Sequence, residues 1–266
     1  MDKKMLSPKE IAKATVNVGY EKVNKSSTTL LFLGVLAGAF IAFGAVGSTI
    51  MGALVKDEGL AKFIGASVFP VGLILVIMAG AELFTGNNLM TLGLMTKRYG
   101  VKDMFRNWII VYAGNFIGSL AVALLIAKSG LYEGVVADTA ISIAVKKTTI
   151  ITNLGLGAVL SRAILCNIIV VLAVWLATGA KDMIGKIFSC WFPIMLFVLS
   201  GYEHSIANMF FIYVGKYIGA EITQAEIWIN NLIPVTVGNL IGGAIIVPVC
   251  YYLIFFKDSE KALSTK

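Results

Sequence analysis

Six long apolar runs constrain the fold of this 266-residue chain more than any other feature of its sequence. About 20 apolar residues in a helix are enough to cross a bilayer. Only 14% of the residues are charged and the mean hydropathy is +0.86, whereas a soluble domain carries about 25% charged residues. The sequence therefore predicts an all-α membrane protein with six transmembrane helices. The runs are Thr28 to Leu54, Phe63 to Leu94, Trp108 to Ala127, Leu154 to Ala177, Ile187 to Val214 and Trp228 to Phe256.

The segments at the two ends of the chain are polar and rich in lysine. Residues 1–27 are predicted to form an N-terminal amphipathic cytoplasmic helix, because Ser7-Pro8-Lys9-Glu10 is a typical helix start. It either lies in the membrane interface or is solvated. Residues 28–256 form the transmembrane domain, and 257–266 a cytoplasmic tail. Fifteen of the 22 Lys and Arg residues fall on the side of the termini, so both termini are expected to be cytoplasmic.

Polar residues interrupt the second and fifth runs in the same way. The pattern Gly-x-Glu-x-x-x-x-Asn begins at Gly80 and again at Gly201, which is 121 residues later. A Phe-Pro pair repeats at an offset of 123, and Gly-Asn-x-x-Gly in the third and sixth runs repeats at 124. Such near-equal offsets indicate an internal repeat. Three spans are an odd number, so the two repeats, about 28–128 and 154–256, must be inverted in the membrane.

The second and fifth runs are also longer than one straight span. Each contains glycine beside the polar residues, so helices 2 and 5 are predicted to be broken. Because free backbone groups cannot face lipid, the unwound parts must lie inside the protein and meet near mid-membrane. Polar groups at that depth are costly and mark a pore or a binding site.

Several side chains in the apolar runs fit more than one role. His204, the single histidine, either faces a pore or is a satisfied core residue. Glu82 and Glu203 either carry protons or, as we favour, accept hydrogen bonds from the broken helices. Asn115 is expected to bond across closely packed helices. Arg162 is expected to pair with a carboxylate or to reach the interface.

The sequence argues against several classes of function. It contains no nucleophile-base pair, metal-ligand cluster or phosphate loop, so we predict no enzyme, no cofactor and no metal. The three cysteines lie in apolar runs without ligand-like spacing and are expected to be buried thiols. The net charge of +7 is spread between the runs, which favours lipid head groups and a permeating anion as partners and argues against nucleic acid.

Five motifs of seven to thirteen residues follow one another across the runs. They are AGAFIAFGA (Ala37–Ala45), AELFTGN (Ala81–Asn87), LCNIIVVLAVW (Leu165–Trp175), EHSIANM (Glu203–Met209) and NLIPVTVGNLIGG (Asn231–Gly243). Together they resemble the formate/nitrite transporter family over nearly all of residues 7–256. The resemblance implies an aquaporin-like protomer of six helices, an inverted 3+3 repeat, and a homopentamer in the bacterial inner membrane with one pore in each protomer.

The resemblance also implies roles for particular residues. The pore centre would be formed by Thr85, His204, Glu203, Asn167, Asn239 and Asn208. A lysine would serve the outer vestibule, with Lys147 and Lys146 as candidates. The constrictions would be formed by Phe69 and Phe197 at the outer slit and by Leu73 and Phe84 at the inner slit, although large apolar side chains in such runs also fit a plain core role.

The implied substrate is a small monovalent weak-acid anion: formate, nitrite or hydrosulfide. Lysine would attract the anion, and the two slits would oppose its passage because it must lose its water to enter them. His204, Thr85 and the asparagines would offset that cost by hydrogen bonding or by proton transfer. Two alternatives share these residues, namely a proton-coupled anion symporter and a channel for neutral solutes.

Overall fold

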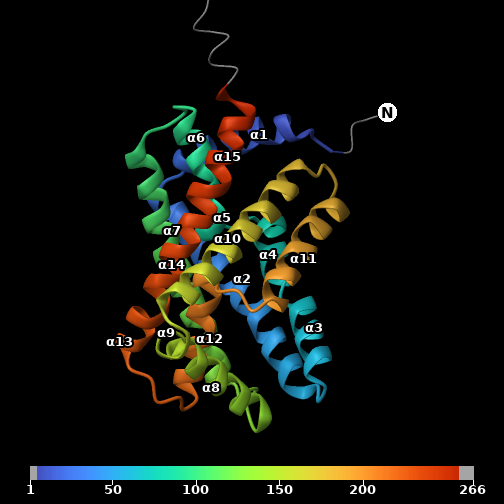
Figure 1. Ribbon diagram of the computed structural model, residues 1–266, viewed down its shortest axis with the longest axis vertical. Helices are drawn as coiled ribbons and strands as arrows, with labels where there is room; N and C mark the ends of the chain where they lie inside the picture. The colour runs from blue at the N-terminus through green and yellow to red at the C-terminus, as the bar shows by residue number, and fades with distance from the viewer. Residues whose placement is uncertain (1–4, 258–266) are drawn as a thin grey trace, which may run out of the picture.

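The computed structural model describes residues 5–257, and the regular structure in that part of the chain is helical (Figure 1). The predicted tail, 257–266, lies outside the described residues apart from its first. The first half contains α1 (Pro8–Val23), α2 (Ser27–Leu54), α3 (Glu58–Val68), α4 (Val71–Leu75), the π-helical turn η1 (Val76–Gly80), α5 (Phe84–Asn87), the 3-10 turn η2 (Asn88–Met90), α6 (Thr91–Met95) and α7 (Val101–Lys128). The second half contains α8 (Val135–Thr148), α9 (Ile150–Leu154), α10 (Leu156–Gly179), α11 (Met183–Leu199), α12 (Ser205–Tyr217), α13 (Gln224–Ile227), the π-helical turns η3 (Trp228–Leu232) and η4 (Ile241–Ile246), which flank α14 (Ile233–Leu240), and α15 (Val247–Phe255).

Five helical segments between residues 5 and 257 are long and apolar enough to cross a membrane. The fifth apolar run differs from the others because it is divided between α11, which has 17 residues, and α12. The protein is therefore an all-helical, multi-pass membrane protein. α8 occupies a segment between the third and fourth apolar runs for which no helix is predicted. The five segments are Ser27–Leu54, Glu58–Gly80, Val101–Lys128, Leu156–Gly179 and Gln224–Phe255.

Glycine ends the helix at both polar interruptions. Gly80 has a φ of +82° and Gly201 a φ of +70°, a region that residues with a Cβ atom rarely adopt. The chain is extended over 81–83 before α5 begins, and over 202–204 before α12 begins. The backbone thus leaves the helical path at two points that are 121 residues apart.

A Gly80→Ala substitution is expected to lower stability by about 1–2 kcal/mol, because alanine pays the steric cost of the left-handed backbone. A Cβ atom at Gly80 would meet no other atom within 4 Å, so the cost comes from the backbone alone. Thermal unfolding of the protein in detergent measures it. Gly52→Ala is the matched control, since a Cβ atom there also meets nothing but the backbone is helical. The control should be neutral or stabilising, and equal losses in both variants would contradict this account.

Small residues bring the long helices of each half into close contact. A Cβ atom at Gly38 would collide with the α7 backbone, and one at Gly118 would collide with the Val35 carbonyl of α2. In the second half, a Cβ atom at Gly242 would collide with the Ile164 carbonyl of α10. The Gly-Asn-x-x-Gly patterns of the third and sixth runs therefore serve close helix packing, as such patterns do in membranes.

The helix α1 begins at Pro8 behind a capping box in which the Ser7 N–H donates to a Glu10 carboxylate oxygen at 2.7 Å. Its buried residues, including Ile11 and Val16, pack with Trp175 of α10 and with residues of α6 and α15. The apolar face of α1 is thus covered by protein rather than by lipid alone. α1 and the C-terminal end of α15 lie at one end of the molecule, and α8 and α13 lie at the other (Figure 1).

Candidate functional site

The two breaks bring together side chains that are 119 residues apart in the sequence. The Thr85 hydroxyl lies 2.8 Å from Nε2 of His204, and both residues are buried. Thr85 stands in the first turn of α5, and His204 is the N-cap residue of α12. The sequence places both in one predicted pore centre, and in the structure they are in direct contact.

The backbone of α12 fixes the state of the neutral imidazole. Nδ1 of His204 accepts a hydrogen bond from the Ala207 N–H at 3.1 Å. A nitrogen that accepts a hydrogen bond carries no proton, so the proton of the neutral ring is on Nε2. Nε2 then donates to the Thr85 oxygen, and the Thr85 hydroxyl proton is free to donate to a third group. The pair is therefore a hydrogen-bond donor at the centre of the protein.

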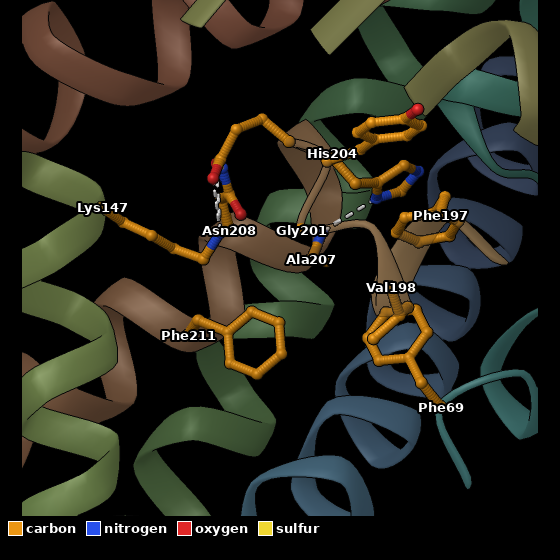
Figure 2. Close-up of a pocket in the computed structure, with 11 residues that line it drawn as sticks. Phe69, Lys147, Phe197, Val198, Gly201, His204, Ala207, Asn208 and Phe211 are labelled. Carbon is orange, nitrogen blue, oxygen red and sulfur yellow. Dashed lines mark hydrogen bonds and ion pairs between the residues drawn. The ribbon is translucent and has the colours of Figure 1, made fainter. Parts of the chain in front are cut away.

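A cavity of about 150 Å³ lies beside His204. Three phenylalanine rings line it, from Phe69, Phe197 and Phe211, and Lys147 reaches it from α8 (Figure 2). The Phe69 and Phe197 rings meet edge to face at 5.6 Å, and the Phe197 ring stacks on the His204 imidazole at 5.7 Å. The cavity thus has Lys147 and the carboxylate of Glu203 in its lining and narrows between aromatic rings at the histidine.

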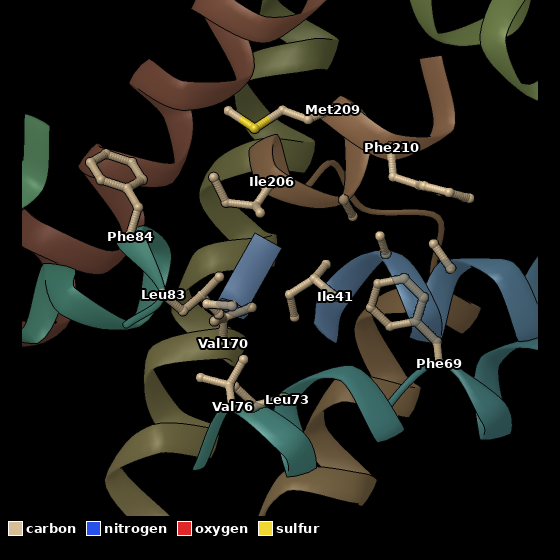
Figure 3. Packing of buried hydrophobic residues seen from close by; sticks show 14 of the residues in the cluster. Ile41, Phe69, Leu73, Val76, Leu83, Phe84, Val170, Ile206, Met209 and Phe210 are labelled. Carbon is tan, nitrogen blue, oxygen red and sulfur yellow. The ribbon is translucent and has the colours of Figure 1, made fainter. Parts of the chain in front are cut away.

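On the other side of these rings the space is far smaller. It measures about 10 Å³, which is about the volume that one water-sized probe needs. Apart from His204 its lining is apolar, which makes it a dry constriction (Figure 3). Its lining consists of Ile41, Phe69, Leu73, Leu83, Val170, Ile194, Phe197 and His204.

Of the four predicted constriction residues, Phe84 has a different environment. Its ring packs against Trp108 and Tyr112 of α7, with centroids at 6.2 and 4.9 Å. Figure 3 shows it apart from Phe69, with other core side chains between them. The preceding residue, Leu83, lines the constriction instead. Leu83 ends the extended segment and Phe84 begins α5, and the sequence pattern does not reveal which of the two faces the cavity.

Lys147 rather than Lys146 faces the cavity beside His204. Its ammonium group lies 3.0 and 3.2 Å from the two Glu203 carboxylate oxygens. The Glu203 side chain is only 6% exposed, and its charge is further satisfied by the Asn208 amide at 2.6 Å. Asn208 also donates to Asn231 at 2.8 Å. Glu203 therefore holds Lys147 in place, and its carboxylate is engaged by lysine and amide groups.

The first half contains an equivalent cluster around Glu82. Lys22 lies 2.6 Å from one Glu82 oxygen, and Lys25 lies 3.0 Å from the other. The Asn87 amide donates to Glu82 at 2.8 Å and to Asn107 at 2.9 Å. Each interruption thus carries one buried carboxylate that is paired with lysine and bonded to two asparagines in series.

The sequence prediction does not name as site residues the lysines that bind Glu82, which are Lys22 and Lys25, or the second asparagine of each cluster, which are Asn107 and Asn231. The sequence nevertheless contains a signal for these positions. Lys25 precedes Lys147 by 122 residues, and Asn107 precedes Asn231 by 124. Both offsets lie within the 121–124 range of the repeat. The lysines stand before the first apolar run, outside the predicted repeat, and so escape a search confined to the spans.

Asn239 and Asn115 hold the two extended segments in place. The Asn239 oxygen accepts from the Ser205 N–H at 2.9 Å, and its amide donates to the carbonyls of Ala163 and Glu203. Asn115 makes the same three contacts in the first half, with the Phe84 N–H and the carbonyls of Gly34 and Glu82. Asn239, predicted at the pore centre, therefore positions the backbone that carries His204.

Asn167 joins the two halves. Its amide donates to the Asn239 carbonyl at 2.8 Å and to the Thr85 carbonyl at 3.4 Å. Its side-chain oxygen is buried and has no hydrogen-bond partner within residues 5–257. Asn167 thus supports the backbone of Thr85 from α10 and keeps one acceptor unused.

Comparison with known proteins gives a family match over most of the chain. The model of the formate/nitrite transporter family matches residues 9–253. A relative from Bacillus subtilis, described as the uncharacterized transporter YrhG, is 44% identical over 97% of both chains. A probable formate transporter from Methanothermobacter thermautotrophicus is 41% identical over 95% of this chain and 98% of its own.

Solved structures agree with the sequence comparison. A channel described as an FNT family ion channel superimposes with a TM-score of 0.84 at 28% identity, over 92% of this chain and 98% of its own. A pentameric formate channel with formate bound superimposes with a TM-score of 0.74 at 30% identity, over 87% and 98%. The resemblance carried by the five motifs is confirmed, and the chain belongs to the formate/nitrite transporter family.

Proposed function

We propose that this chain is a channel for a small monovalent weak-acid anion, with formate, nitrite or hydrosulfide as substrate. We place it in a bacterial inner membrane with both termini cytoplasmic, as a homopentamer in which each protomer has its own pore. The named relatives and the formate-bound pentameric neighbour support the substrate class and the assembly. The lysine-rich N-terminal segment supports the orientation.

We further propose an aquaporin-like protomer of six spans in two inverted repeats. The segment from α3 to α6 would form the second span, and α11 with α12 the fifth, each interrupted at its polar residues. The two lysine–glutamate–asparagine clusters and the two asparagine contacts with extended backbone support this, because each feature occurs once in each half at matching positions. Inverted repeats with binding groups at their interface are a common design of membrane transporters.

The observation that carries the proposal is the Thr85–His204 pair, whose histidine lines both the cavity that Lys147 reaches and the dry constriction. A positive wall raises the local concentration of anions. Lys147 would therefore draw the anion into the cavity beside His204. Its engagement with Glu203 keeps the ammonium group in place there without fixing the anion too tightly for release.

The constriction would then oppose passage, because an apolar space too small for a hydration shell disfavours a bare charge. The Thr85 hydroxyl and the His204 imidazole are the groups that offset this cost at the entrance. The Thr85 hydroxyl can donate a hydrogen bond to the anion, and the imidazole orients that hydroxyl by donating from Nε2 to its oxygen. Proton transfer would require the doubly protonated ring, in which Nδ1 gives up its hydrogen bond from the Ala207 N–H. Nε2 would then pass its proton to an anion oxygen, so that the acid crosses the constriction uncharged.

Flux assays with the protein reconstituted in liposomes test the proposal. Labelled formate should equilibrate down its own gradient, and nitrite and hydrosulfide should compete with it. Glycerol should not enter faster than in protein-free liposomes. Uptake that requires a pH gradient and accumulates formate above equilibrium would instead establish a proton-coupled symporter. Glycerol or water passage without anion flux would establish a neutral-solute channel.

Lys147→Met is expected to lower formate flux about tenfold, since a steering charge changes the encounter rate by about 10- to 1,000-fold. Lys128→Met is the matched control because Lys128 is an exposed lysine at the end of α7 and does not line the cavity beside His204. The control should keep nearly the full flux. Equal losses in both variants would show that general surface charge, rather than the cavity lysine, attracts the anion.

A further inference from the structure

The Arg162 side chain lies within α10, one of the segments that can span the membrane. Neither a hydrogen bond nor an ion pair of this guanidinium is found within residues 5–257, so the predicted pairing with a carboxylate is not seen there. Glu203 lines the cavity that Arg162 faces, but its carboxylate is bound by Lys147. An arginine at membrane depth is costly without a counter-charge. An anion from outside the described chain is therefore expected beside Arg162.

Arg162 faces a cavity of about 420 Å³ that is separate from the one beside His204. Lys146 lines this cavity too, and its ammonium group likewise has no partner within the described residues. The remaining walls are mostly apolar and include Ile143, Ile150 and Leu154. The cavity thus combines two unpaired cationic side chains with mostly apolar walls.

Size and polarity distinguish among possible anions. A water molecule takes up about 30 Å³, so a one-carbon anion would fill only a small part of this cavity and would gain nothing from its apolar walls. An anion that carries an apolar hydrocarbon chain would contact both the two cations and the apolar walls. The only abundant molecules of that kind beside a membrane-spanning helix are anionic lipids.

We propose that this cavity binds the head group of an anionic phospholipid, with Arg162 and Lys146 holding the phosphate. A guanidinium offers two parallel N–H donors that match phosphate oxygens, and a lysine adds a point charge. The glycerol backbone and first acyl carbons lie against Ile143, Ile150 and Leu154. This site is distinct from the proposed pore and does not depend on which solute the protein carries.

The lipid site and the cavity beside His204 share the Lys147–Glu203 ion pair as a common wall. A bound phosphate would lie next to that pair and neutralise the excess positive charge around it. The lipid is therefore placed to stabilise the α8–α10 region on which the position of Lys147 depends.

Native mass spectrometry of the intact oligomer, delipidated and then titrated with phosphatidylglycerol, tests the proposal. The wild type should retain phosphatidylglycerol in preference to phosphatidylcholine. Loss of one charged hydrogen-bonding group should weaken that binding about 10- to 100-fold in Arg162→Gln. Lys146→Gln, at an exposed position on α8, provides a second variant should Arg162→Gln fail to fold, and it should weaken binding in the same direction. Lys62→Gln is the matched control, since Lys62 is an exposed lysine of α3 outside this cavity, and it should bind like the wild type.

Three outcomes would overturn the proposal. Equal retention of the two lipids would show that the site does not distinguish them by the charge of the head group. Unchanged binding in both Arg162→Gln and Lys146→Gln would place the lipid elsewhere. Displacement of the lipid by millimolar formate, with formate protection lost in Arg162→Gln, would assign the cavity to the permeating anion.

Discussion

Formate flux through a His204→Ala protein in liposomes should fall by about 10- to 100-fold, because a hydrogen bond to a charged group is worth about 1.5–3 kcal/mol. The imidazole stands where the cavity narrows into the dry constriction, and it is the only histidine in the chain. The pH dependence of the flux is measured for both proteins. The variant should lose the part of that dependence that histidine supplies.

Thr85→Val is the matched comparison, since it removes the partner of Nε2 but leaves the ring. It should lower flux less than His204→Ala and keep the pH dependence. Both proteins must elute as the wild-type oligomer, so that flux reflects the pore and not its assembly. A His204→Ala protein with wild-type flux and an unchanged pH profile would remove the histidine from the mechanism.

Thermal unfolding of Asn239→Leu should show the largest loss of stability, about 3 kcal/mol or more. The substitution leaves the Ser205 N–H and the Ala163 and Glu203 carbonyls without this partner, and each buried group left unpaired costs about 1–3 kcal/mol. Asn115→Leu should lose a similar amount of stability, because Asn115 makes the same three contacts in the first half. The measurement is unfolding in detergent, followed by tryptophan fluorescence.

Asn153→Leu is the control, since Asn153 is an exposed asparagine, and it should change stability little. Asn239→Asp keeps an oxygen for the Ser205 N–H and should fall between the two. A stable Asn239→Leu protein that has lost its flux would show that Asn239 contacts the anion directly. A loss of stability no greater than that of Asn153→Leu would refute its role in holding the backbone.

The family and the outline of the fold could be predicted from the sequence because they depend on local chemistry. Long apolar runs can satisfy their backbone groups in lipid only as helices. The Gly-x-Glu and Gly-Asn-x-x-Gly patterns repeat at nearly constant offsets, so the relation between the halves is visible without coordinates. Thr85 and His204 are placed together by the family resemblance and not by the repeat, since their separation of 119 residues lies outside the repeat offsets.

Other parts of the site could not be predicted because several arrangements satisfy the same pattern. Leu83 ends an extended segment and Phe84 begins α5, and only packing decides which one lines the constriction. Lys146 and Lys147 are also neighbours. They lie on α8, which falls outside the apolar runs and is not predicted from them. Their directions differ by about 100° around the helix axis. Lys147 therefore reaches Glu203, while Lys146 has no carboxylate partner among the described residues, although both line the cavity that Arg162 faces.

The sequence by itself determined that this chain spans a membrane as helices and carries one polar interruption in each of two related halves, since hydropathy and spacing are properties of neighbouring residues. Only the tertiary structure decided what each polar side chain does. Asn239 bonds to backbone, Lys22 and Lys25 join Glu82 from outside the apolar runs, and Arg162 is left without a carboxylate among the described residues. The physical reason is that a hydrogen bond or ion pair depends on distance and direction in space, which residues far apart in the sequence acquire only when the helices pack.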